Sequence, residues 1–262
     1  MNKEMQLLYK RAMLDRYYIE ETIRHLNVKL TDISCIDVGC GPGVSTQILY
    51  DCFPKAKIVV GIDNDTYAIA CAKKQNQNNI VFTCADAKHL PFKEGTFDFC
   101  FSRMLLDIAQ NTEMILNEMI RVIKPKGYIV LYGNIRTTAK GTVLPKNAGI
   151  IIDAYRRYIR LTKRKGFDVE YIVDLLEKAG LSCSVKKIVK DVNKPGRKDL
   201  LEYYSVPEAE LKEFAKENIL VKMHLALSDQ VFDYEQSLIN LLNDEKVYLS
   251  FEQAIIVAKK EM

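Results

Sequence analysis

The sequence predicts an α/β protein built on a parallel sheet with helices on both faces. In the first half of the chain, short apolar runs alternate with longer amphipathic patterns, which is typical of such a sheet. A glycine-rich turn at residues 39–43 joins the first apolar run to the next helical pattern. Turns of this kind hold nucleotide-type ligands at the carboxyl ends of parallel strands, so the fold class also predicts the position of a site.

The individual elements follow from hydrophobic periodicity. An amphipathic helix is predicted over residues 3–27, because Leu8, Ala12 and Ile19 recur at helical spacing together with Ile23 and Leu26. The KPKG sequence at 124–127 is expected to stop the helix that is predicted at 113–123. The strands are predicted at 33–38, 57–62, 80–84, 97–101 and 128–132, and the helices between them at 44–53, 66–75 and 113–123.

The second half of the chain changes character. Helices are predicted at 149–165 and 168–179, a strand at 181–189, a mostly helical stretch at 191–248 and a last strand at 249–259. Without a repeat or linker, the chain is expected to form one domain. Its parts are an N-terminal helical cap (1–32), a cofactor-binding core (33–133), helices with strand six (134–190), a helical lid insertion (191–249) and the last strand (250–262).

Composition narrows the functional classes. The 262 residues carry a net charge of +4, too small to imply a nucleic-acid partner by itself. No apolar stretch approaches the ~18 residues that span a bilayer, and the charged N-terminus does not resemble a signal peptide. The seven cysteines include no C-x-x-C pair and are expected to be reduced. We therefore expect a cytoplasmic protein without a membrane partner or a metal.

The glycine turn discriminates between ligands. Its pattern is G-x-G-x-G, whereas a dinucleotide-binding turn requires glycine where this chain has Val44. Asp37, two residues before Gly39, would repel a pyrophosphate and attract a ligand with an ammonium or sulfonium group. This disfavours an NAD-dependent oxidoreductase and favours S-adenosylmethionine (SAM), which has both cationic groups and no phosphate.

Two further carboxylates fit SAM. Asp63 ends the second predicted strand, 20 residues beyond Gly43, where an acidic side chain can accept from both ribose hydroxyls. Asp86 follows the third strand and is placed to accept from the adenine amino group, and the Ala87 N–H could meet the adjacent ring nitrogen. As single residues, Asp63 and Asp86 are equally typical of helix caps and turns.

Four motifs in order resemble class I SAM-dependent methyltransferases: DVGCGPG, GIDND, ADAKHLPFKEGTFDFCFS and LNEMIRVIKPKGYIVLYG. The third is similar to the branch of ubiquinone/menaquinone-biosynthesis and small-molecule methyltransferases. The resemblance implies a Rossmann-like, mostly parallel sheet of seven strands with an antiparallel last strand. It also implies roles for cofactor-binding residues: Asp37, Gly39, Gly41 and Gly43 near the methionyl group, Asp63 at the ribose, Asp86 and Ala87 at the adenine, and Ser102 at the cofactor edge of the fourth strand.

The resemblance assigns no fixed catalytic residue, because the sulfonium already activates the methyl group for S_N2 transfer. In the family, the position of Asp107 often carries a histidine that faces this methyl. Asp107 is therefore a candidate base, although we favour a structural role such as capping the helix that begins near residues 111–112.

The acceptor is expected to be a small molecule, with the helices of residues 191–248 roofing its pocket. The alternative is an RNA-binding or RNA-modifying protein that uses the basic helix 154–166. The sequence predicts no oligomeric state.

Overall fold

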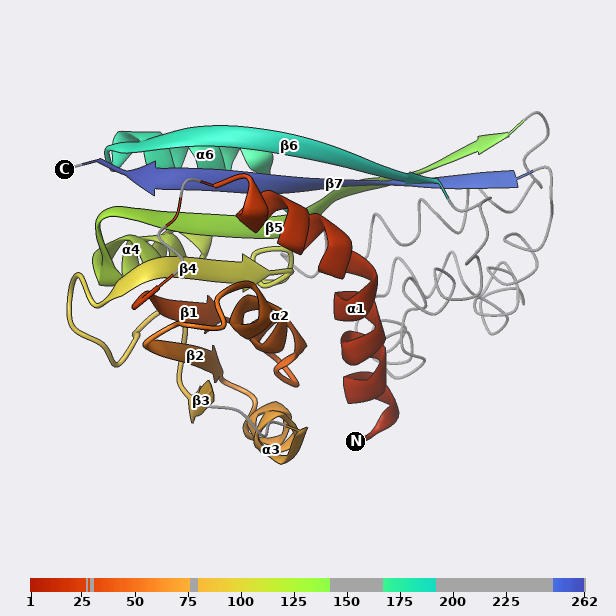
Figure 1. Cartoon of the computed structure of the whole chain (residues 1–262). Helices are drawn as coiled ribbons and strands as arrows, with labels where there is room; N and C mark the ends of the chain where they lie inside the picture. Colours follow the sequence, from red (N-terminus) through yellow and green to blue (C-terminus); the bar gives the residue numbers. More distant parts are fainter. Residues whose placement is uncertain (27, 29–30, 76–79, 142–166, 192–246, 262) are drawn as a thin grey trace. The chain divides into compact units, whose positions relative to one another are not determined.

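The computed structural model describes residues 1–26, 28, 31–75, 80–141, 167–191 and 247–261. Its strands are β1 (Ser34–Val38), β2 (Ile58–Asp63), β3 (Ile80–Cys84), β4 (Phe97–Arg103), β5 (Ile123–Gly141), β6 (Leu181–Asp191) and β7 (Val247–Lys260). They form one seven-stranded sheet in the order β3-β2-β1-β4-β5-β7-β6. The pairs β1–β2, β2–β3, β1–β4 and β4–β5 are parallel, whereas β7 runs opposite to β5 and β6 (Figure 1). The predicted fold class is confirmed.

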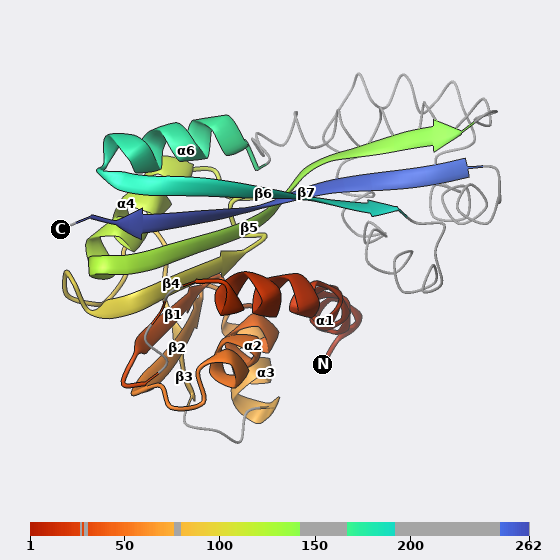
Figure 2. The ribbon, with the colours of Figure 1, turned by 45° about the horizontal axis from the view of Figure 1, so that its top comes forward.

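Helices cover both faces of the sheet (Figures 1 and 2). On one face lie α1 (Lys3–Arg24), α2 (Val44–Cys52) and α3 (Thr66–Gln75), and on the other lie α4 (Thr112–Val122) and α6 (Val169–Lys178). Alternate strand residues enter the two cores, because successive side chains of a strand point to opposite faces. Cys35 packs in the core under α1–α3, and its neighbour Ile36 packs in the core under α4 and α6.

The predicted start of the fifth strand is wrong. Strand β5 begins directly after α4, and Ile123 pairs with Phe97 before the register shifts. After this irregularity the ladder resumes with Tyr128 opposite Phe99. Lys126 adopts a left-handed φ of 65° within the shifted segment. The KPKG sequence therefore makes a bulge inside a strand, where we had expected a loop that ends a helix.

The chain divides into two compact units. One contains residues 1–135, 165–188 and 253–262, and the other contains residues 136–164 and 189–252. The predicted basic helix 154–166 lies outside the described residues, as does nearly all of the predicted lid 191–249, so both stay predictions. Among the described residues, no helix is long and apolar enough to cross a membrane.

Candidate functional site

The turn between β1 and α2 needs its glycines for conformation and for space. Gly39, Gly41 and Gly43 have φ values of 77°, 51° and 86°, in the left-handed region that side chains with a Cβ rarely adopt. A Cβ on Gly39 would lie 3.0 Å from Leu105, and one on Gly43 would lie 2.8 Å from the ring of Phe82. At Gly41 the nearest atom would be 3.9 Å away. The turn therefore has a crowded inner side and an open position at its centre.

Asp37 ties the end of β1 to the first turn of α2. Its side chain is fully buried, and its Oδ2 accepts hydrogen bonds from Ser45 Oγ at 2.6 Å and Thr46 Oγ1 at 2.7 Å. Burial raises the pKa of Asp37 to about 6, although both hydroxyl groups favour the charged form. Oδ1 is buried and has no hydrogen-bond partner among the described residues. This oxygen is the only atom of the Asp37 carboxylate that the described residues do not engage.

Asp63 holds the glycine turn from the neighbouring strand. Its Oδ2 accepts from the Gly41 N–H at 2.8 Å, and its Oδ1 accepts from the Asp65 N–H at 2.9 Å. Each carboxylate oxygen has a second lone pair, so these bonds leave room for two more donors. The structure thus brings Asp37, Asp63 and the glycine turn together at one edge of the sheet.

The remaining predicted cofactor-binding residues, Asp86, Ala87 and Ser102, differ in solvent exposure and in their hydrogen bonds. The Ala85 N–H donates to the Asp63 carbonyl, which sets Asp86 beside the end of β2. Asp86 is exposed, and its Oδ1 accepts from the Lys88 N–H, which lowers its pKa. Ala87 is half-buried against the core under α4 and α6. Ser102 is buried and donates to the Val38 carbonyl at 2.8 Å, so its hydroxyl joins two strand ends.

Sequence reasoning missed a buried polar network on the α1 side of the sheet. Asp15 of α1 is fully buried, and its Oδ2 accepts from Arg103 Nε at 2.8 Å. The Tyr132 hydroxyl lies 2.9 Å from Asp15 Oδ1 and 2.6 Å from Gln253 Oε1. Gln253 in turn donates to Asn134 Oδ1 at 2.8 Å. One signal was present, because Asp15 falls on the apolar stripe of the first helix.

Asp107 belongs to the loop after β4. Its Oδ1 accepts from the Asn134 N–H at 2.7 Å, whereas its Oδ2 is buried without a partner among the described residues. Burial raises the pKa of Asp107 to about 7. The N-cap of α4 is Asn111, without a side-chain hydrogen bond. The expectation that Asp107 caps this helix is therefore wrong; it binds the backbone of β5 instead.

Comparisons with known proteins show which family the predicted cofactor-binding core resembles. Residues 36–131 match the family model described as a methyltransferase domain. This part of the chain is similar to a methyltransferase domain, and the resemblance to SAM-dependent methyltransferases is confirmed. The matched residues of this domain include the glycine turn, Asp37, Asp63 and Asp107, but neither Asp15 nor Gln253.

Curated methyltransferases are similar in sequence to part of this chain. A malonyl-[acyl-carrier protein] O-methyltransferase of Marinomonas sp. is 28% identical over 120 residues, 45% of this chain and 44% of that protein. The chain spans less than half the length of the first curated relatives it matches, 31–44%.

Two solved structures share the fold of the methyltransferase domain. The YcgJ protein of Bacillus subtilis has a TM-score of 0.60 at 15% identity, covering 92% of this chain and 97% of that one. A Haemonchus contortus phosphoethanolamine N-methyltransferase, solved with S-adenosylhomocysteine, has a TM-score of 0.58 at 18% identity. The match covers 94% of this chain and 53% of that one.

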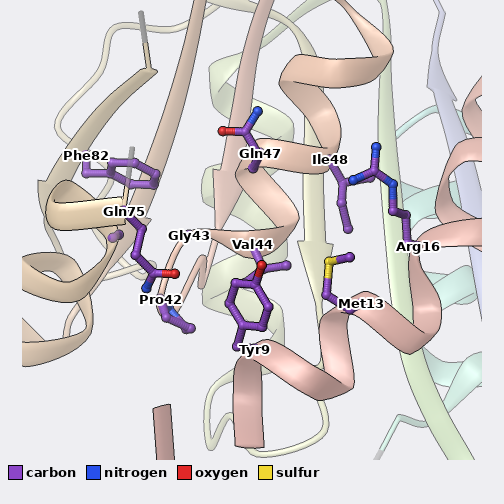
Figure 3. A pocket seen from close by; sticks show the side chains of 11 residues that line it. Tyr9, Met13, Arg16, Pro42, Gly43, Val44, Gln47, Ile48, Gln75 and Phe82 are labelled. Carbon is purple, nitrogen blue, oxygen red and sulfur yellow. The ribbon is translucent and has the colours of Figure 1, made fainter. Parts of the chain in front are cut away.

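A cavity of about 160 Å³ lies beside the start of α2, between that helix, α1 and α3. Tyr9 of α1 points toward Val44 in its wall, and Gln75 of α3 points toward Pro42 (Figure 3). None of the predicted carboxylates lines it, although Gly43 does. The cavity therefore adjoins the glycine turn on the side of the helices and is distinct from the edge where Asp37 and Asp63 meet. Its lining residues are Tyr9, Met13, Arg16, Pro42, Gly43, Val44, Gln47, Ile48, Ala72, Gln75 and Phe82.

The cysteines form no disulfide among the described residues. All seven are free thiols, and burial raises the pKa of Cys52 and of Cys183 to about 11, so both stay protonated at neutral pH. Within the described part of the chain, no three His, Cys, Asp or Glu side chains are grouped as metal ligands.

Proposed function

We propose that this protein is a SAM-dependent methyltransferase that transfers the methyl group to a small-molecule acceptor. The observation that carries the proposal is the hydrogen bond from the Gly41 N–H to Asp63, which fixes the open glycine turn against an acidic side chain. Asp37 adds a second carboxylate at the same edge, with one buried oxygen unpaired among the described residues. The edge therefore suits a ligand with ribose hydroxyls and a cationic end.

The residues present fit the cofactor. Asp63 retains lone pairs for the ribose hydroxyls, Asp86 and Ala87 stand at the next strand end for the adenine, and Asp37 supplies negative charge for the methionyl group. Bound SAM supplies a methyl group that is already electrophilic. The chain's remaining task is to hold the acceptor about 3–3.5 Å from that methyl, in line with the bond that breaks.

The related proteins support this proposal. The malonyl-[acyl-carrier protein] and phosphoethanolamine enzymes are methyltransferases by name, and the latter structure contains S-adenosylhomocysteine. Their acceptors differ from each other. The family therefore supports methyl transfer, and the acceptor has to be inferred from this chain's own residues.

The cofactor is tested first by calorimetry with S-adenosylhomocysteine and, separately, with NAD. We expect S-adenosylhomocysteine to bind and NAD to give no heat beyond dilution, because NAD would place a pyrophosphate near Asp37 and Asp63. NAD binding more tightly than S-adenosylhomocysteine would overturn the proposal.

Replacement of Asp63 by alanine should weaken S-adenosylhomocysteine binding about 10- to 100-fold. The variant loses charge-assisted hydrogen bonds of ~1.5–3 kcal/mol to the ribose and also frees the Gly41 N–H from the bond that orients the turn. Calorimetry on the folded variant measures the effect. The matched control is Asp174→Ala, which removes an exposed carboxylate on α6 and should leave the affinity unchanged. An Asp63→Ala protein that binds like the control would show that the cofactor lies elsewhere.

A further inference from the structure

Asp107 carries an oxygen that the fold leaves without a donor. The side chain is fixed, because its Oδ1 accepts from the Asn134 N–H and the Ala109 N–H closes a turn onto the Leu105 carbonyl. Its Oδ2 is buried and has no hydrogen-bond partner among the described residues. Since buried acceptors are almost always paired in native proteins, an unpaired carboxylate oxygen suggests a ligand that supplies the donor.

This oxygen belongs to the edge of the sheet where the cofactor is proposed to bind. Asp107 follows the carboxyl end of β4, and its partner Asn134 lies beyond the paired residues of the adjacent β5. The same loop reaches the glycine turn, because Leu105 fills the space next to Gly39. Asp107 is therefore placed on the side of the sheet from which an acceptor would approach a bound methyl donor.

The charges around Asp107 favour a cation. The described groups that act on it are Arg103, which lowers its pKa, and Asp15, which raises it. Arg103 is already paired with Asp15, so its charge is largely compensated. Asp37 and Asp63 add negative charge to the same edge. A carboxylate acceptor would be repelled here, whereas an ammonium group would be attracted.

We propose that Asp107 binds the ammonium group of an amine acceptor through Oδ2 and takes its proton before methyl transfer. This inference rests on the proposed function. The N–H bond breaks, its electron pair stays on nitrogen, and the proton passes to Oδ2. The neutral amine then attacks the methyl of SAM: a C–N bond forms, the C–S bond breaks and its electrons remain on sulfur. The products are a methylated ammonium ion and S-adenosylhomocysteine.

The titration of Asp107 suits this role. A base works best when its pKa lies near the working pH, and burial raises the pKa of Asp107 to about 7. Amine binding should therefore weaken as pH falls below 7, because the protonated carboxyl no longer attracts the ammonium group. A simple alkylamine keeps its charge throughout this range, so the change reports on the protein.

The test uses three probes that share a phenyl ring and differ in their polar end: 2-phenylethylamine, 2-phenylethanol and 3-phenylpropionate. Each is titrated by calorimetry into the protein saturated with S-adenosylhomocysteine, at pH 8 and pH 6. We expect the amine to bind at least 10-fold more tightly than the other two at pH 8, and to lose about 10-fold at pH 6. Asp107→Asn keeps an acceptor for the Asn134 N–H and should lose the amine preference and its pH dependence while binding S-adenosylhomocysteine within threefold of wild type.

The controls separate this inference from the proposed function. Asp174→Asn, an exposed neutralisation on α6, should behave as wild type. Wild-type protein that fails to bind S-adenosylhomocysteine would overturn the proposed function. If the wild-type protein binds S-adenosylhomocysteine normally, three results would overturn only the role of Asp107. These are an amine that binds no more tightly than the other probes, no binding of any probe, and an Asp107→Asn variant that retains the amine preference. Should that variant not fold, Asp107→Ser replaces it in the same titrations, because Asp37 also titrates in this pH range. The role is rejected if Asp107→Ser retains the amine preference or if the wild-type preference does not depend on pH.

Discussion

Replacing Asp15 with alanine is expected to lower the free energy of unfolding by about 3–5 kcal/mol. Asp15 is fully buried and Arg103 is 9% exposed, so the variant leaves a guanidinium inside the protein without the carboxylate that pairs with it. The Tyr132 hydroxyl also loses an acceptor. Chemical denaturation of the purified protein, followed by circular dichroism, measures the change.

Two comparison variants give this prediction its specificity. Asp15→Leu combined with Arg103→Met replaces both charges with apolar groups and should recover most of the lost stability, since no unpaired charge remains. Asp174→Ala breaks an exposed pair with Lys178 and should leave unfolding almost unchanged. If Asp15→Ala unfolds at the same denaturant concentration as wild type, the buried pair does not stabilise the docking of α1.

Replacing Gly43 with alanine is expected to cost about 2–5 kcal/mol. The left-handed φ of 86° contributes ~1–2 kcal/mol for a residue with a Cβ, and the contact of that Cβ with Phe82 at 2.8 Å adds ~1–3 kcal/mol of overpacking. Ala72 lies 2.9 Å away on the same side, so the new methyl group has little room to shift. The denaturation midpoint reports the loss.

Gly41→Ala is the matched variant in the same turn. Its φ of 51° brings a similar conformational cost, but the nearest atom would be 3.9 Å from the Cβ, so we expect only ~1–2 kcal/mol. This variant should still weaken S-adenosylhomocysteine binding measurably, because the methyl group occupies the open centre of the turn. Equal destabilisation by the two substitutions would show that the crowding at Gly43 is relieved by movement of Phe82.

The sequence predicted the sheet well where each strand is short and bounded by turn residues. Strand β1, which is buried throughout, and strand β3 were placed within one residue, and the helix predicted at 66–75 has those bounds in α3. The prediction failed at β5, because the KPKG sequence has the local chemistry of a helix stop and a loop. Pairing of Ile123 with Phe97 carries the strand through it, and this pairing depends on a neighbouring strand that local propensity does not include.

At the candidate site, the sequence by itself determined which residue types stand at the strand ends. The three glycines of the turn and the acids Asp37, Asp63 and Asp86 follow from their spacing relative to the apolar runs, since parallel strands bring their carboxyl ends to one edge. Three positive φ values at the glycines accord with the prediction of a turn that only glycine makes easily.

Only the tertiary structure decided which partner each polar group has. Asp63 meets the Gly41 N–H across 22 residues of chain, and Asp15 meets Arg103 across 88. Asp107 binds the Asn134 N–H, although its place in the sequence favoured a helix cap. Periodicity fixes the face on which a side chain lies, but a hydrogen bond requires two groups within about 3 Å, and strand order together with helix docking determines which groups come that close.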